Sequence, residues 1–230
     1  MRRQALAMRV VEVFRSIQGE GTRAGEVSAF VRLAGCPVRC AYCDTSYAWD
    51  GGQELSVAQV VARVEGLGCK AMTVTGGEPM ADPDTPHLLS ALLDAGHEVT
   101  LFTSGCCPLY DVPQAVHIVL DMKTPWVHEA GVPGDQRPGA PPPFLAPGAL
   151  ERLGRSDEVK FVVRSRVEFE WVVDFATSAR LFDRVGAVLV GPVWGSLDPA
   201  VLADWLVASN LPFRLNLQLH KYLFGDRPGR

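Results

Sequence analysis

Three cysteines, Cys36, Cys40 and Cys43, follow an apolar run with the spacing C-x3-C-x2-C. Three thiolates at this spacing can bind three irons of a cubane [4Fe–4S] cluster and leave the fourth iron open. A structural metal site normally closes its coordination shell, whereas an open position is typical of a site that does chemistry. The spacing therefore predicts a reactive iron–sulfur cluster.

A structural zinc site and buried thiols are the alternatives for these cysteines. Zinc takes four ligands, usually two CxxC-type pairs or histidines at helical spacing. The remaining cysteines are Cys69, Cys106 and Cys107, and none lies at a suitable spacing for a fourth ligand. The cluster is therefore favoured, and these three cysteines are expected to be thiols without a cofactor role.

Composition places the chain among soluble globular proteins. Its 230 residues carry a net charge of −4, and 47% of them are hydrophobic. We expect a single domain over residues 1–230, with no electrostatic case for binding nucleic acid or an anionic membrane. The start of the sequence does not resemble a signal peptide, and no run approaches the ~18 apolar residues that cross a bilayer. A reduced cluster needs a reducing compartment, so a cytoplasmic protein is expected.

Apolar β-branched runs alternate with amphipathic stretches along the chain. The predicted strands are Val10–Phe14, Val27–Leu33, Ala71–Thr75, Glu98–Thr103, Val116–Asp121, Val159–Val163, Ala187–Val190 and Phe213–Leu217. Helical stripes are formed by Val57, Val60, Val61 and Val64 (with Ser56 as the cap), by Leu88, Leu89, Leu92 and Leu93, by Phe169, Val172, Val173 and Ala176, and by Val201, Leu202, Trp205 and Leu206. This alternation predicts an α/β fold with a parallel sheet.

Polar and glycine-rich residues follow several of these strands. The cysteine motif follows one strand, Gly76 the next and Ser104 the one after. Because the carboxyl ends of parallel strands meet at one edge, these residues are expected to converge on one face. The proline-rich segment 124–146 holds six prolines and three glycines, and we expect it to be a surface loop that could serve as a flap over the site.

The cysteine motif and the segment Gly76-Gly77-Glu78-Pro79 together resemble the radical S-adenosylmethionine (SAM) superfamily. The aromatic Tyr42, just before the last cysteine, completes the pattern. The resemblance implies that SAM binds the open iron, and that Gly77 and Glu78 lie nearest its amino group. It also places Ser104 at the position that contacts the SAM carboxylate or ribose. A plain strand–turn is the alternative for the first segment, and an ST-turn for the second.

Three further segments narrow the resemblance to the 7-carboxy-7-deazaguanine synthase family. They are Phe14–Gly21, Arg32 in the strand before the cluster, and Thr45 after it; the chain end, Leu217–Tyr222, is also similar to this family. The resemblance covers essentially the whole chain and implies a partial (β/α)6 barrel of the radical SAM type.

The family resemblance implies a lyase that converts 6-carboxy-5,6,7,8-tetrahydropterin to 7-carboxy-7-deazaguanine with loss of ammonia. This is a step in queuosine and 7-deazapurine biosynthesis, a pathway of tRNA modification. The implied cofactors are the [4Fe–4S] cluster, SAM, which is regenerated, and Mg²⁺. The implied partners are an electron donor such as flavodoxin or ferredoxin and a second copy in a homodimer.

Site residues carry over from the family position by position. The residues matched to the substrate site are Ile17, Gln18, Gly19, Glu20, Arg32 and Thr75. Those matched to the SAM site are Tyr42, Cys43, Asp44, Gly77, Glu78, Ser104, Asp121, Met122, Lys123, Gly191, Pro192, Val193 and Trp194. Thr45 is matched to Mg²⁺, and Arg32 to the substrate carboxylate, which suits a guanidinium. The sequences of the segments 121–123 and 191–194 differ from those that are more common in the family.

Other functions remain open on the sequence. Another small radical SAM enzyme, such as a glycyl-radical enzyme activase, would use the same cluster without needing Arg32 or the Gln-Gly-Glu-Gly segment in these places. A molybdenum-cofactor type cyclase is disfavoured because the sequence has no group of C-terminal cysteines that could bind a second cluster. A non-catalytic electron carrier or zinc module would cleave no SAM.

Overall fold

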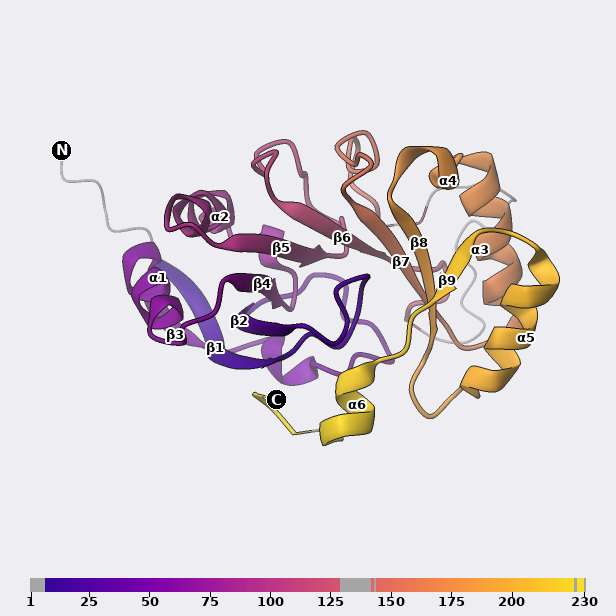
Figure 1. Ribbon diagram of the computed structural model, residues 1–230, viewed down its shortest axis with the longest axis horizontal. Coiled ribbons are helices and arrows are strands. Elements are labelled where there is room, and N and C mark those ends of the chain that lie inside the picture. Colours follow the sequence, from indigo (N-terminus) through magenta and orange to yellow (C-terminus); the bar gives the residue numbers. More distant parts are fainter. Residues whose placement is uncertain (1–6, 129–141, 143, 226, 230) are drawn as a thin grey trace.

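One twisted sheet of nine strands organises the chain, in the order β3-β1-β2-β4-β5-β6-β7-β8-β9 (Figure 1). The structure is a computed structural model that describes residues 7–128, 142, 144–225 and 227–229. The strands are β1 (Ala7–Ile17), β2 (Val27–Leu33), β3 (Gln53–Ser56), β4 (Ala71–Gly76), β5 (Glu98–Thr103), β6 (His117–Met122), β7 (Glu158–Val163), β8 (Ala187–Pro192) and β9 (Phe213–Leu215). The edges, β3 and β9, do not pair, so the sheet is open.

Seven strands, β2 and β4 to β9, run parallel, as the sequence predicts. The first strand differs from this prediction, because β1 pairs antiparallel with both β2 and β3. We had not predicted β3: Gln53 and Glu54 are exposed, so this edge strand has no apolar alternation for a pattern to detect.

The four predicted amphipathic stretches are helices: α1 (Val57–Glu65), α2 (Thr85–Asp94), α3 (Arg166–Ser178) and α5 (Pro199–Ser209). Ser56 caps α1 as expected and forms a capping box with Gln59. The short elements α4 (Leu181–Arg184), α6 (Leu219–Phe224), η1 (Ser46–Ala48) and η2 (Pro79–Ala81) were not predicted, since fewer than two helical turns leave no periodic stripe.

The main core lies between the sheet and the helices. Figure 1 shows α1 and α2 beside one end of the sheet and α3, α4 and α5 beside the other. Val31 of β2 and Val74 of β4 are fully buried in this core. Because side chains alternate across a strand, Phe30 and Arg32 of β2 point to the opposite face, where they line a cavity. The helices α1 to α5 thus occupy one face and leave the other for a site.

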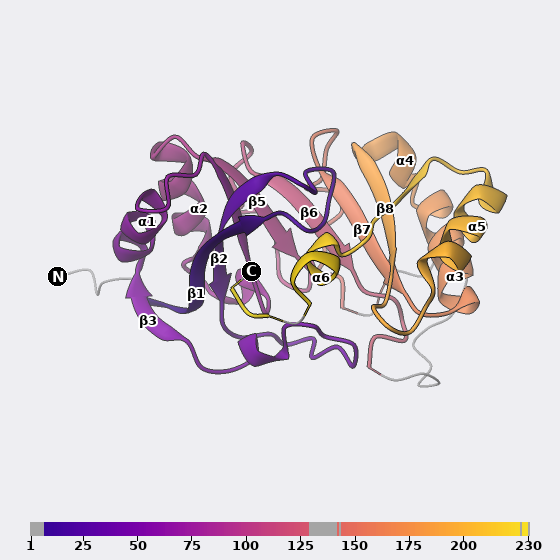
Figure 2. The same cartoon turned by 60° about the horizontal axis from the view of Figure 1, so that its bottom comes forward.

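Two segments cover the cavity face. The hairpin joining β1 and β2 and the helix α6 lie on the same side of the sheet (Figure 2). They are joined by the backbone of Leu219, whose N–H donates to the carbonyl of Gly19 at 2.9 Å.

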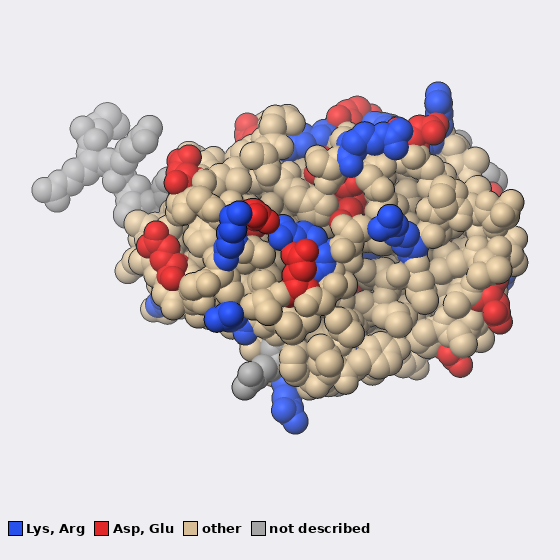
Figure 3. All heavy atoms as spheres, viewed as in Figure 1, with Lys and Arg blue, Asp and Glu red and all other residues tan. Residues whose placement is uncertain are grey.

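The proline-rich segment 124–146 lies mostly outside the described residues, which omit 129–141 and 143, so its prediction as a flap stays a prediction. Within the described part of the chain, no helix has the length and apolarity to cross a membrane. On the face drawn in Figure 3, acidic and basic side chains are interspersed.

Candidate active site

A cavity of about 590 Å³ opens at the carboxyl ends of the parallel strands, within the range of small-molecule sites. It gathers most of the predicted site residues: Ile17, Gln18, Gly19, Glu20, Arg32, Cys36, Cys40, Tyr42, Cys43, Asp44, Thr45, Thr75, Gly77, Ser104, Asp121, Lys123, Val193 and Trp194. Residues from positions 17 to 194 therefore meet in one place, as the strand-end rule predicts.

Four predicted SAM-site residues do not line this cavity. Met122 is 1% exposed and belongs to the core behind the sheet. Gly191 lies against β9, where an added Cβ would come within 2.3 Å of the Asn216 carbonyl oxygen. Its neighbour Pro192 is buried at the β7–β8 pairing. The fourth is Glu78.

Glu78 is turned into the protein and is 1% exposed. Its carboxylate accepts hydrogen bonds from Thr103 Oγ1 (2.7 Å), Ser104 N (2.7 Å) and Ser104 Oγ (2.5 Å), and from Met80 N (3.0 Å). A carboxylate with four donors has little capacity left for a ligand. The structure gives the Glu78 side chain a supporting role, in which it joins the ends of β4 and β5.

The cysteine loop packs as a compact unit over the cavity. All three cysteines are free thiols, and Cys40 is 8% exposed against Val38 and Val127. Burial raises the pKa of the Cys40 thiol to about 11 and also raises that of Cys43. Among the described residues, no three Cys, His, Asp or Glu side chains converge on one metal ion. Cubane ligands need not converge, since each sulfur binds a different iron.

Gly77 joins the glycine segment to the cysteine loop. Its N–H donates to Leu33 O at 3.0 Å, and the next N–H, of Glu78, donates to Gly35 O at 2.7 Å. A Cβ on Gly77 would lie 2.2 Å from Gly35 O and 2.8 Å from Cys36 Cβ. Only glycine therefore allows this strand end to approach the cysteine loop so closely.

The predicted substrate segment at Gln18–Glu20 also lines the cavity. Gln18 is buried, and its Nε2 donates to Thr73 Oγ1 at 2.9 Å. Its Oε1 accepts from Glu20 N at 3.2 Å, so the amide holds the hairpin and also faces the cavity. A Cβ on Gly19 would lie 2.1 Å from His220 Nδ1, so α6 packs directly on this segment.

Arg32 lines the cavity from near the carboxyl end of β2. Its Nε lies 2.6 Å from Glu12 Oε1, which also accepts from Tyr47 Oη at 2.8 Å. The guanidinium carbon lies 5.8 Å from the ring centres of Phe14 and Tyr47. These contacts fix the side chain at Nε and leave its terminal nitrogens as candidate donors to an anion.

Thr45 and Asp44 extend the cysteine loop toward α6. Thr45 Oγ1 donates to Asp44 Oδ1 at 2.7 Å, so its oxygen lone pairs remain available to a cation. Asp44 Oδ2 accepts from Gln218 Nε2 at 2.9 Å and lies 3.6 Å from His220 Nε2. Burial alone would raise the pKa of Asp44, but His220 and Thr45 hold it well below its ordinary value.

A buried charge network crosses the cavity floor. Lys160 Nζ lies 2.8 Å from Asp121 Oδ2 and 3.0 Å from Glu20 Oε1, and Lys123 Nζ lies 2.9 Å from Asp121 Oδ1. Burial opposes these charges, yet the neighbouring opposite charges raise the pKa of both lysines and lower that of Asp121. All three groups therefore stay charged at neutral pH.

Several residues that line the cavity had not been predicted as site residues. They include Phe14, Phe30, Trp49, Thr73, Phe102, Thr103, Lys160, Arg164, Gln218, His220 and Lys221. Phe30 and Thr73 could have been found from strand alternation, because they lie two residues before Arg32 and Thr75 on the same strand faces. Lys160 could not be found in this way, because no site residue was predicted on β7. Gln218 and His220 lie in the family-like chain end Leu217–Tyr222, to which no role had been assigned.

Comparisons with known proteins decide the family. Residues 31–128 match the Radical SAM superfamily. The chain is 38% identical over 217 residues to the 7-carboxy-7-deazaguanine synthase of Chlorobaculum tepidum, covering 94% of each chain. It is 32% identical to that of Koribacter versatilis, covering 94% of this chain and 97% of the relative. The chain belongs to the 7-carboxy-7-deazaguanine synthase family.

Solved structures agree on the fold. The crystal structure of QueE from Escherichia coli matches with a TM-score of 0.71 at 22% identity, over 93% of this chain and 95% of that chain. SuiB from Streptococcus suis matches with a TM-score of 0.55, over 78% of this chain and 46% of that chain. The predicted open radical SAM fold and the predicted 7-carboxy-7-deazaguanine synthase family, a family of radical SAM lyases, are confirmed. The activase and electron-carrier alternatives are not favoured.

Proposed function

We propose that this protein converts 6-carboxy-5,6,7,8-tetrahydropterin to 7-carboxy-7-deazaguanine with loss of ammonia, in 7-deazapurine biosynthesis. The observation that carries the proposal is one cavity that is lined both by the three cysteines and by Arg32 and Gln18–Glu20. When bound, the [4Fe–4S] cluster and SAM supply the hydrogen-atom abstraction that starts the reaction.

The donor set fits the cluster and SAM. Cys36, Cys40 and Cys43 are free and border the cavity, and the Tyr42 hydroxyl is buried there without a hydrogen-bond partner among the described residues. We assign the three cysteines to the cluster. The cavity residues among the predicted SAM contacts, notably Ser104, Asp121 and Lys123, would hold SAM beside it.

The cavity residues Gln18–Glu20 and Arg32 suit a carboxylated pterin. A pterin edge presents paired donors and acceptors, which the Gln18 amide, the Gly19 backbone and the Glu20 carboxylate would match. Arg32 would pair with the substrate carboxylate. The aromatic walls Phe30 and Phe102 would exclude water from the reacting atoms.

Magnesium would bind at Thr45. Mg²⁺ prefers oxygen ligands and keeps several waters, so a hydroxyl with free lone pairs together with substrate oxygens would suit it. We further propose that the protein works as a homodimer and takes electrons from a flavodoxin or ferredoxin.

Anaerobic incubation of the reduced, cluster-loaded protein with SAM, Mg²⁺ and the pterin tests the proposed function. Mass spectrometry should detect 7-carboxy-7-deazaguanine. Glycyl-radical formation on a partner protein, or SAM cleavage that no pterin stimulates, would overturn the proposal.

A further inference from the structure

The tip of the β1–β2 hairpin lies across the open side of the sheet and is held there residue by residue. Glu20 Oε1 lies 3.0 Å from Lys160 Nζ of β7. Gly21 N donates to Asn216 Oδ1 at 2.8 Å, just beyond β9. Thr22 N donates to Glu158 Oε2 at 3.0 Å, and Thr22 Oγ1 donates to the same carboxylate. Three consecutive tip residues are thus tied to the far end of the sheet.

Strand β7 supplies two of these three ties. Glu158 and Lys160 are two residues apart, so they point to the same face of the strand, and each is 2% exposed. Buried charges are costly unless they are paired. Each has one partner on the hairpin tip and one on β6: His117 Nε2 lies 3.0 Å from Glu158, and Asp121 Oδ2 lies 2.8 Å from Lys160. The ion pairs between β6 and β7 therefore hold Glu158 and Lys160 in position under the hairpin tip.

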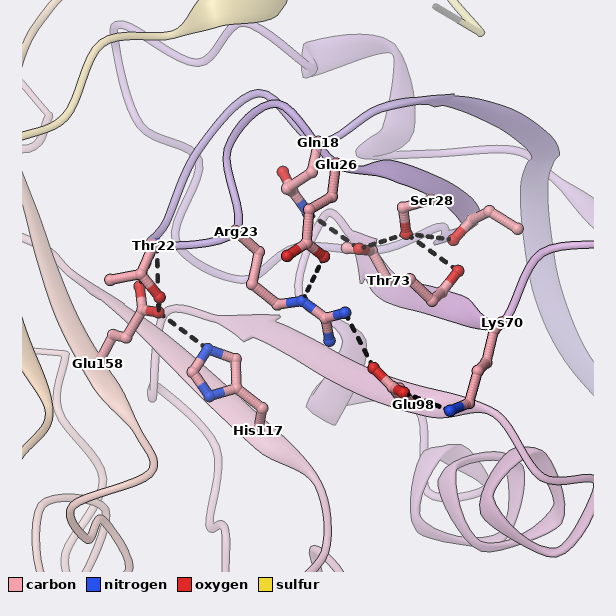
Figure 4. A network of polar contacts seen from close by, with 12 residues as sticks. Gln18, Thr22, Arg23, Glu26, Ser28, Lys70, Thr73, Glu98, His117 and Glu158 are labelled. Carbon is pink, nitrogen blue, oxygen red and sulfur yellow. Dashed lines mark hydrogen bonds and ion pairs between the residues drawn. The ribbon is translucent and has the colours of Figure 1, made fainter.

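The tip is connected to the cavity through Gln18. Glu20 N donates to Gln18 Oε1, and Gln18 Nε2 donates to Thr73, which is itself hydrogen-bonded to Ser28. Figure 4 shows the Gln18–Thr73–Ser28 contacts on one side of the hairpin and the Thr22–Glu158–His117 contacts on the other. A shift of Thr22 or Glu20 would therefore move the amide that faces the cavity.

A second set of contacts at the same hairpin provides a comparison. Arg23 pairs with Glu26 at 2.7 Å and with Glu98 at 3.1 Å, and Lys70 pairs with Glu98 at 2.7 Å. The acidic partners are about half exposed, at 48% and 49%. Exposed pairs of this kind contribute little, so they should not fix the tip.

We propose that Glu158 and Lys160 are positioning residues that clamp the hairpin tip and thereby hold Gln18 and Glu20 in place for the pterin. Lys160 borders the cavity, whereas Glu158 does not and acts through Thr22. The inference rests on the proposed function for its substrate. Glu158 and Lys160 lie more than 130 positions from the hairpin in the sequence. They affect the pterin site through the backbone of the hairpin tip.

Hydrogen exchange on the cluster-free protein tests the clamp without turnover. Glu158→Gln and Thr22→Val should each speed amide exchange at Gly21 and Thr22 by about tenfold or more, since a hydrogen bond to a charged group is lost or weakened. Thr22→Ser and Arg23→Ala should exchange like the wild type. Thr22→Val changes an exposed residue and keeps the test valid if Glu158→Gln fails to fold.

Kinetics of the loaded enzyme complete the test. Glu158→Gln and Lys160→Met should raise KM for the pterin by about tenfold or more, and in Glu158→Gln, which lies outside the cavity, SAM binding and kcat should change much less. Lys160→Arg, which keeps the charge, should recover part of the loss. If the wild type forms deazaguanine while these variants match Arg23→Ala in both amide exchange and KM, that result would overturn the proposal that Glu158 and Lys160 clamp the hairpin tip. If the wild type makes no deazaguanine, the proposed function fails, and the exchange result still decides the clamp.

Discussion

Gly77 and Cys36 are in direct contact: a Cβ built on Gly77 would lie 2.8 Å from the Cβ of Cys36. The strand end that carries the glycine segment and the loop that carries the cysteines therefore form one packed unit. The backbone of Glu78 strengthens this unit by donating to Gly35 O at 2.7 Å. The two motifs that resemble the radical SAM superfamily are thus parts of one local structure.

Gly77→Ala should therefore damage the cluster site itself. The added methyl group would come within 2.2 Å of Gly35 O, and backbone atoms must move to admit it. We expect iron and sulfide content after reconstitution to fall by at least about half, with SAM cleavage reduced further. Gly66→Ala is the matched control, because its added Cβ meets nothing closer than 3.4 Å. Equal iron content in both variants would contradict this packing argument.

Arg32→Ala should weaken pterin binding strongly. Removing one partner of a charged hydrogen-bonded pair costs on the order of 3 kcal/mol, so KM should rise by about a hundredfold. SAM cleavage without pterin should persist, because Arg32 lies on β2 and not on the cysteine loop. Arg63→Ala removes an exposed arginine on α1 and should leave KM unchanged. An unchanged KM in Arg32→Ala would contradict the proposal that Arg32 pairs with the substrate carboxylate.

Local signals in the sequence predicted the cysteine loop, the glycine segment and most strands, since each is a short pattern. They did not predict where side chains point. Glu78 was matched to SAM, but it turns inward to Thr103 and Ser104. The tie from Thr22 to Glu158 spans 136 positions. Such a contact depends on the curvature of the whole sheet, which no local pattern carries.

Thr45→Ala should blunt the response to magnesium. Thr45 Oγ1 donates its hydrogen to Asp44, which leaves the oxygen free for a cation. Without this oxygen the ion loses one ligand of its octahedron, so turnover should fall by about tenfold at low magnesium and recover partly at high magnesium. Cluster content and SAM binding should not change. Thr45→Ser keeps the hydroxyl and serves as the control; a full metal response in Thr45→Ala would exclude the assignment.

The His117–Glu158 pair should make stability depend on pH. His117 meets acceptors at both ring nitrogens, Ser156 O and the Glu158 carboxylate, with Asp157 nearby. Burial alone would lower the pKa of His117, but Glu158 raises it above its ordinary value of about 6.5. This stabilisation is therefore complete below about pH 6.5 and is lost as pH rises through the raised pKa.

Urea unfolding of the wild type and His117→Gln between about pH 5.5 and pH 9 measures this effect. The variant should be less stable by on the order of 1–2 kcal/mol at the acid end, and the difference should shrink toward the alkaline end. Burial opposes a lowered pKa in Glu158, but His117 and Thr22 lower it, so Glu158 stays ionised throughout this range. His97→Gln is the control; a difference that does not vary with pH would show that His117 is neutral in the folded protein.

We propose above that this cavity holds the pterin while it is rearranged and that SAM is regenerated in each turnover. The most direct measurement is anaerobic turnover of 6-carboxy-5,6,7,8-tetrahydropterin with SAM limiting, at about a tenth of the pterin concentration. We expect several equivalents of 7-carboxy-7-deazaguanine per SAM, with most of the SAM recovered intact. Consumption of all SAM to 5′-deoxyadenosine with no deazaguanine would contradict it.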